Sequence, residues 1–140
     1  MTLQQEDKNA LITLRLQRAR ETISEAKGNM QLGYWRIAAN RLYYACYYAA
    51  SALLIKNNLT AYTHAGVINQ FGLHFVTKGH ISKEQGKFLK RLFNLRQSSD
   101  YDDWFNIDEN DVRPLLEPAE RFLTEIENLI CKDNLFRIMT

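Results

Sequence analysis

Apolar residues recur near the start of the chain at alternating spacings of four and three, the repeat of an amphipathic α-helix. The repeat consists of Ile12, Leu16, Ala19, Ile23, Ala26 and Met30. Charged side chains fill the positions between them, and Gly28 and Gly33 mark the end of the segment. The pattern predicts a long helix over about residues 6–30 with one apolar stripe.

The stretch over about residues 34–57 is apolar on nearly every side. One stripe consists of Trp35, Ala38, Ala39, Leu42, Ala45, Cys46, Ala49 and Leu53, and other sides carry Tyr43, Tyr44, Tyr47 and Tyr48. A helix that is apolar all round belongs in the middle of a bundle, and buried tyrosine hydroxyls there need hydrogen-bond partners. Arg41 must reach a carboxylate, a tyrosine or a solvated cleft, or extend along the helix into solvent.

Three further helices are expected in the second half of the chain. A short one spans about residues 64–76, with Thr63 as its cap. Ser82 and Gln85 have the spacing of a capping box and begin a fourth helix, which is apolar up to Leu95 and polar after it.

The final helix begins at an acidic cap, Asp108 or Asp111, and continues to about residue 130. Pro114 suits its first turn, whereas Pro118 is expected to kink it. No stretch alternates with period two for long enough to predict a strand. The fold class is therefore all-α: an up-and-down bundle of four long helices plus one short helix.

The length of 140 residues suits one domain, residues 1–140, with a core over about residues 6–132. No apolar run approaches the roughly 20 residues of a membrane-spanning helix, and the first eight residues lack the apolar core of a secretory signal. Cys46 is expected to be a small core residue, and a disulfide with Cys131 is the less favoured alternative. A cytoplasmic location fits these features.

The net charge of +2 conceals a reversal along the chain. Residues 78–96 hold six cations and one acid, a charge of +5, whereas residues 97–112 hold six acids and no Lys or Arg, a charge of −6. Such a reversal is typical of a basic face beside an acidic loop, or of two solvated helix faces with opposite bias.

The common catalytic and metal-binding motifs are missing from the sequence, including the phosphate-binding glycine loop and paired cysteines. His64, His74 and His80 lack the spacing of metal ligands on one helix face, so no metal site or cofactor is predicted. We interpret His64 and His74 as packing or capping residues.

The strongest functional signal is Arg96-Gln97-Ser98-Ser99-Asp100-Tyr101, which follows directly on an apolar helix. Asp100 lies four residues after Arg96, within reach of an ion pair, and Tyr101 can project beside them. The alternative is a purely structural helix-end pair with Tyr101 as a half-buried anchor.

Three stretches make the chain resemble the HEPN domains, small helical bundles of bacteria and archaea, and especially their stand-alone branch. They are Arg41-Leu42-Tyr43-Tyr44-Ala45, His64-Ala65-Gly66-Val67-Ile68 leading to Phe71-Gly72-Leu73-His74-Phe75, and Leu95-Arg96-Gln97-Ser98-Ser99-Asp100-Tyr101. The likeness covers about residues 14–130.

This resemblance implies a homodimer in which the fourth-helix motifs of two subunits face each other across a cleft. Many HEPN proteins are metal-independent ribonucleases, and many are toxins encoded beside a minimal nucleotidyltransferase antitoxin. Active members carry an arginine that holds the phosphate and, four to six residues later, a histidine that activates the ribose hydroxyl or protonates the leaving group.

Arg96 matches that arginine, but the histidine is missing. Tyr101, Asp102 and Asp103 stand five, six and seven residues after Arg96, and no histidine follows His80. Tyrosine, with a pKa of about 10, is a poor base at neutral pH. The sequence therefore favours binding over cleavage.

Three hypotheses follow from these residues. In the first, a HEPN-like dimer binds RNA or a nucleotide, with Arg96, Arg41, Lys90, Arg91 and Tyr44 as the binding residues. The second is a metal-independent ribonuclease toxin in which Arg96 and Tyr101 act and Asp100 orients them. The third is a non-catalytic interaction partner of a nucleotidyltransferase, which could modify Tyr101.

Overall fold

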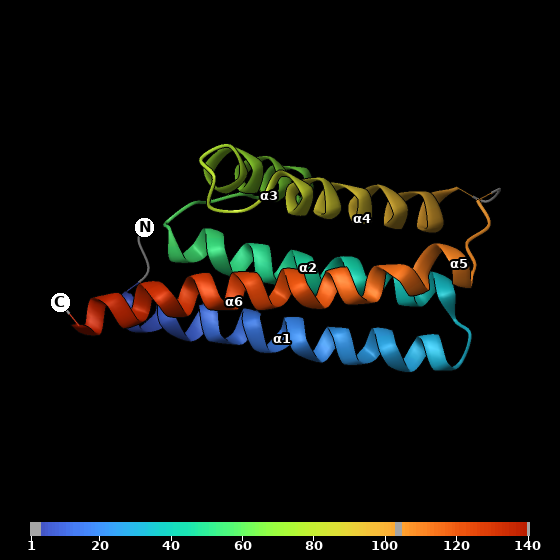
Figure 1. Ribbon diagram of the computed structural model, residues 1–140, viewed down its shortest axis with the longest axis horizontal. Helices are drawn as coiled ribbons and strands as arrows, with labels where there is room; N and C mark the ends of the chain where they lie inside the picture. The colour runs from blue at the N-terminus through green and yellow to red at the C-terminus, as the bar shows by residue number, and fades with distance from the viewer. Residues whose placement is uncertain (1–3, 103–104, 140) are drawn as a thin grey trace.

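The computed structural model describes residues 4–102 and 105–139, and the side chains among them up to residue 132; all regular structure in these ranges is helical. The four long helices are α1 (Gln5–Gln31), α2 (Trp35–Lys56), α4 (Lys83–Tyr101) and α6 (Leu116–Met139). They run alternately up and down, and the short α3 (His64–Phe71), which comes between α2 and α4 in the chain, lies beside α4 on one side of α2 (Figure 1). The predicted all-α bundle of four long helices and one short helix is confirmed.

Helix α2 is the centre of the bundle. It contacts α1, α3, α4 and α6, and α1 and the α3–α4 pair lie on opposite sides of it (Figure 1). Its alanines, among them Ala45 and Ala49, are fully buried and let the neighbouring backbones come close. The apolar character of α2 on all sides follows from this position, as predicted.

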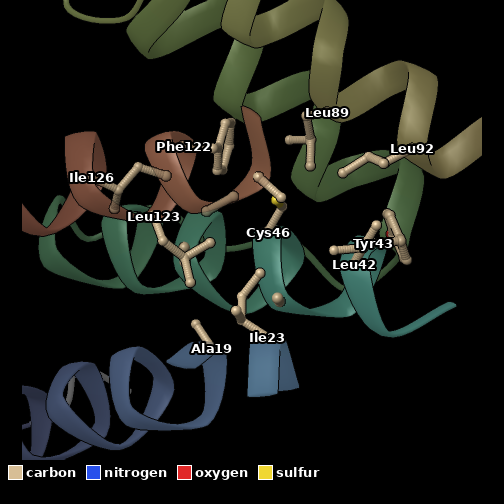
Figure 2. Close-up of a cluster of buried hydrophobic side chains, with 14 of the residues drawn as sticks. Ala19, Ile23, Leu42, Tyr43, Cys46, Leu89, Leu92, Phe122, Leu123 and Ile126 are labelled. Atoms are coloured by element: carbon tan, nitrogen blue, oxygen red, sulfur yellow. The ribbon is translucent and has the colours of Figure 1, made fainter. Parts of the chain in front are cut away.

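The core joins side chains from all four long helices. Figure 2 shows Ala19 and Ile23 of α1 below α2, with Leu89 and Phe122 of α4 and α6 above it. Cys46 is fully buried between these layers, as predicted, and burial raises the pKa of its thiol. Cys46 and the exposed Cys131 are both free, so the disulfide alternative is wrong.

Side-chain caps define where three helices begin. The Thr63 hydroxyl accepts the Gly66 N–H at 2.9 Å, as predicted. Ser82 accepts the Gln85 N–H at 3.2 Å, but among the described residues the reciprocal bond of a capping box is not formed. The complete capping box belongs to Asp108, which begins the short helix α5 (Glu109–Val112).

Two predicted helices differ in detail from the structure. The short helix continues from α3 as a π-helical turn, Gly72–Val76. The final helix is divided into α5, a 3-10 turn at Arg113–Leu115 and α6, so the irregularity lies one turn before Pro118 rather than at it. Pro118 has no N–H, and in a regular α-helix its ring would clash with the carbonyl of the residue four positions earlier. The α geometry therefore breaks in the turn that precedes Pro118.

Within the described residues, no helix is long and apolar enough to cross a membrane.

Candidate functional site

Residues 96–101 form the last turns of α4, and the Arg96 side chain lies against α2. Arg96 Nη2 donates a hydrogen bond to the Tyr44 hydroxyl at 3.2 Å. The guanidinium carbon lies 5.4 Å from the centre of the Tyr44 ring and 6.0 Å from that of Tyr43. The Arg96 side chain is only 15% exposed, so its charge is partly removed from water. Aromatic faces are favourable partners for such a guanidinium.

Asp100 and Tyr101 flank the same guanidinium. Arg96 Nε lies 3.0 Å from Asp100 Oδ2, which confirms the predicted ion pair, although the Nε–H does not point at the carboxylate as a hydrogen bond requires. The Tyr101 ring centre lies 5.5 Å from the guanidinium carbon. Tyr101 is 72% exposed, so its interpretation as a half-buried anchor is wrong. We call Arg96, Asp100, Tyr43, Tyr44 and Tyr101 the Arg96 cluster.

Arg41 reaches this cluster from α2. Its guanidinium carbon lies 5.2 Å from the centre of the Tyr44 ring, which Arg96 also contacts. Arg41 Nε and Nη2 donate to Asn40 Oδ1 at 3.0 and 2.7 Å, and Asn40 Nδ2 donates to Asp100 Oδ2 at 3.4 Å. A chain of polar contacts therefore joins the two arginines through an amide and a carboxylate.

Lys90 and Arg91 lie on other faces of α4. Lys90 lines a cavity between α3 and α4 together with Lys83 and Lys87. Arg91 lines a hollow beside α5 that also contains Asp111. The +5 stretch is thus spread around the helix rather than gathered at Arg96, and Asp103 of the acidic stretch lies outside the described residues.

His64 joins the site from the first turn of α3. Its Nδ1 is hydrogen-bonded to the Tyr43 hydroxyl at 2.7 Å, and its ring stacks on Tyr47 with centres 4.4 Å apart. It also meets the Tyr44 ring edge-on at 5.6 Å. Sequence reasoning assigned His64 to packing or capping; the ring does pack on the tyrosines of α2, and Thr63 rather than His64 is the cap. The one available signal was the need of the buried Tyr43 hydroxyl for a partner.

Burial and the nearby charge of Arg96 lower the pKa of His64, so its imidazole is neutral at pH 7. Burial, and then the neighbouring Tyr47 and Tyr44, raise the pKa of Tyr43, which keeps its phenol protonated. The Tyr43 hydroxyl can therefore donate to Nδ1 of the neutral ring, and in that arrangement Nε2 carries the imidazole proton.

We expect an NMR titration to give His64 a pKa below the 6.5 of an unperturbed histidine. Arg96→Gln should move that pKa upward because it removes a positive charge. Protonation of His64 favours the unfolded chain, in which the histidine has the higher pKa. The contribution of His64 to the free energy of unfolding is therefore fully present above pH 6.5, and it is lost as the pH falls from 6.5 through the lower pKa of the folded protein. The urea-unfolding free energy should fall less over this window in His64→Gln. A His64 pKa at or above 6.5 would contradict the assigned environment.

The cluster combines guanidinium donors, tyrosine rings and a neutral imidazole. Guanidinium groups match the oxygens of phosphate, and exposed rings offer stacking surfaces for bases. In the ranges that the structure describes, no three His, Cys, Asp or Glu side chains lie close enough together to hold a metal ion. The arrangement is suited to recognising a phosphate with an attached base.

Known proteins resemble this chain over most of its length. The sequence pattern described as HEPN domain matches residues 12–129. A UPF0332 protein of Thermotoga maritima is 38% identical over 89% of this chain and 94% of its own. A Methanocaldococcus jannaschii protein named "Putative toxin MJ0605" is 37% identical over 80% of this chain and 78% of its own. The crystal structure of TT1696 from Thermus thermophilus has the same fold, with a TM-score of 0.71 at 17% identity over 84% of this chain and 96% of its own.

Proposed function

Because this chain belongs to the HEPN domain family, we propose that it binds single-stranded RNA or a nucleotide through the phosphate, at the Arg96 cluster. The observation that carries the proposal is the position of the Arg96 guanidinium among the rings of Tyr43, Tyr44 and Tyr101. Arg41 extends the positive charge across Tyr44. Partial burial strengthens the attraction of these guanidiniums for a phosphate, because less water screens it.

Asp100 must share Arg96 with an incoming phosphate. The Arg96–Asp100 pair links residues four apart on one helix, and it is an ion pair without a hydrogen bond from Nε. Charge-assisted hydrogen bonds to phosphate contribute about 1.5–3 kcal/mol each. A phosphate can therefore displace the carboxylate, and Asp100 sets how readily it does so.

We expect Arg96→Ala to weaken the binding of a labelled oligouridylate at least about tenfold, the effect of one lost charge-assisted contact. The slope of log affinity against log salt should fall by about 0.7, the value for one phosphate on a single strand. Asp100→Asn should have the opposite effect and raise the affinity. Fluorescence anisotropy over a salt series measures all three quantities.

The matched control is Arg121→Ala, which removes the same charge from an exposed position on α6. It should leave both affinity and salt slope unchanged, and light scattering should give the same oligomeric state for every variant. Equal losses in Arg96→Ala and Arg121→Ala would mean that RNA is held by overall charge, and the Arg96 site would be abandoned.

The proposal includes a homodimer and a role in a toxin–antitoxin pair with a nucleotidyltransferase. Support for a dimer comes from Leu32, Tyr34 and Ile37, large apolar side chains that are exposed at the end of the bundle where α4 ends (Figure 1). The association of two copies would remove these apolar side chains from water. Two relatives carry the word toxin in their names, and the exposed Tyr101 is open to modification by a partner.

One observation favours RNA cleavage as a second candidate function. His64 supplies an imidazole beside the same two tyrosines as Arg96, although no histidine follows Arg96 in the sequence. In the other neutral tautomer the Nδ1–H of His64 donates to the Tyr43 hydroxyl oxygen, which leaves the Nε2 lone pair to accept the proton of a ribose 2′-hydroxyl next to a phosphate held by Arg96. Cleavage of total RNA that persists with a chelator, and that is lost in both Arg96→Ala and His64→Gln, would distinguish catalysis from binding.

A further inference from the structure

A second group of arginines packs on a tyrosine of α2, one helical turn from Tyr44. Arg15 and Arg18 of α1 each place their guanidinium carbon 5.9 Å from the centre of the Tyr48 ring. Tyr48 is half-buried, Arg18 is exposed and Arg15 is intermediate. We call Arg15, Arg18 and Tyr48 the Tyr48 cluster.

The arginines of this cluster are short of partners. Arg41 and Arg96, which also pack on tyrosine rings, are paired with Glu25 and Asp100. Within the described part of the chain, Arg15 and Arg18 form no ion pair, and the buried Nε of Arg15 has no hydrogen-bond acceptor. Two like charges three residues apart on a helix repel each other, and an anion placed between them relieves that repulsion.

The two clusters are joined by half-buried tyrosines. The ring centres of Tyr44 and Tyr48 lie 6.0 Å apart, and Tyr47 lies within 6.1 Å of each. Arg96 contacts one end of this group at Tyr44, and Arg15 and Arg18 contact the other end at Tyr48. Cationic groups in line with aromatic rings form the kind of surface on which single-stranded nucleic acid binds.

We propose that the Tyr48 cluster is a second phosphate subsite, so that the ligand is single-stranded RNA spanning both clusters rather than a mononucleotide. The inference rests on the proposed function of the Arg96 cluster. It adds the chemical class of the ligand and the path that the ligand follows across the surface of α2. One phosphate lies at Arg96, and the strand follows α2 over the tyrosines to a further phosphate between Arg15 and Arg18. A mononucleotide occupies the Arg96 cluster alone.

The test compares a short labelled oligouridylate with uridine 3′-monophosphate on full-length protein. Arg15→Ala/Arg18→Ala should weaken oligouridylate binding at least about tenfold, through the loss of charge-assisted contacts, and lower the salt slope by about 0.7. Its affinity for the monophosphate should equal that of the unaltered protein. Arg96→Ala should weaken the binding of both ligands.

Lys83→Ala/Lys87→Ala is the matched control, since it removes two exposed positive charges from the first half of α4, where they line the cavity beside α3. It should change the oligouridylate affinity much less than the α1 double variant does. Because Arg15 is half-buried and Arg18 is exposed, Arg18→Glu serves as a second variant: the reversed charge should weaken oligouridylate binding while the thermal melt shows that the protein is still folded.

Each outcome has a distinct meaning. A selective loss of oligouridylate binding in the α1 variants supports the second subsite. Arg96-dependent binding that is unaffected by the α1 variants overturns the second subsite and leaves the proposed function standing. Equal losses in the α1 and lysine variants also overturn it, because overall charge would then explain the effect. Failure of the unaltered protein to bind either ligand overturns both proposals.

Discussion

Phe122→Ala is expected to lower the free energy of unfolding by about 3–5 kcal/mol, the range for removing a buried aromatic ring. Phe122 of α6 is 1% exposed, and its ring centre lies 5.6 Å from Phe71 and 6.4 Å from Phe88. It therefore joins α6 to both α3 and α4. Because a domain has only about 5–15 kcal/mol of stability in total, the loss should be visible as a large fall in the urea midpoint.

Leu73→Ala is the control for this result. Leu73 is 58% exposed on the π-helical turn, and shortening a side chain in such a position changes stability by about 0.5 kcal/mol or less. Similar losses in the two variants would mean that Phe122 does not hold the layers together as described.

Tyr43→Ala is expected to have a comparable effect, about 3–5 kcal/mol, and to disturb the Arg96 cluster as well. Tyr43 is fully buried, lies 5.7 Å from Phe93 between ring centres, and supports both His64 and Arg96. Without the ring, both functional side chains lose the surface that positions them. Oligouridylate binding should therefore fall together with stability.

Tyr43→Phe separates the hydroxyl from the ring. It should cost only about 1 kcal/mol, the contribution of one hydrogen bond, because half-buried His64 can find water in place of the lost partner. The stacking surface beneath Arg96 is kept, so oligouridylate affinity should be retained. Denaturant titrations give the free energy of unfolding of the two variants, and fluorescence anisotropy gives their oligouridylate affinity. Equal losses of stability and affinity in Tyr43→Phe and Tyr43→Ala would contradict the role assigned to the ring.

The long helices could be predicted because each has to bury one apolar stripe, and that requirement is written as a period along the chain. The irregular backbone at Arg113–Leu115 was harder to place, since two prolines compete over a few residues and local sequence does not rank them. The Arg96–Asp100 pair was predictable for a different reason: four residues on one helix fix its geometry.

The contacts between helices were not predictable in the same way. His64 and Tyr43 are 21 residues apart and come from different helices, so their hydrogen bond depends on which faces of α2 and α3 meet. The same is true of Arg15 and Arg18, which periodicity places on an outer face of α1 and which the structure places over Tyr48. A single sequence indicates which residues share a face of each helix. Which face of one helix packs on which face of another is decided by the packing of the whole bundle.

The Arg96 cluster and His64 draw on three helices, with α2 on one side and the α3–α4 pair on the other. The complete site exists only while that pair is docked on α2. Any ligand that contacts both sides binds the docked form alone, and by mass action it shifts the local opening equilibrium toward that form. Occupancy of the site and closure of this seam are therefore thermodynamically coupled, and the ligand itself contributes to holding the two halves of the bundle together.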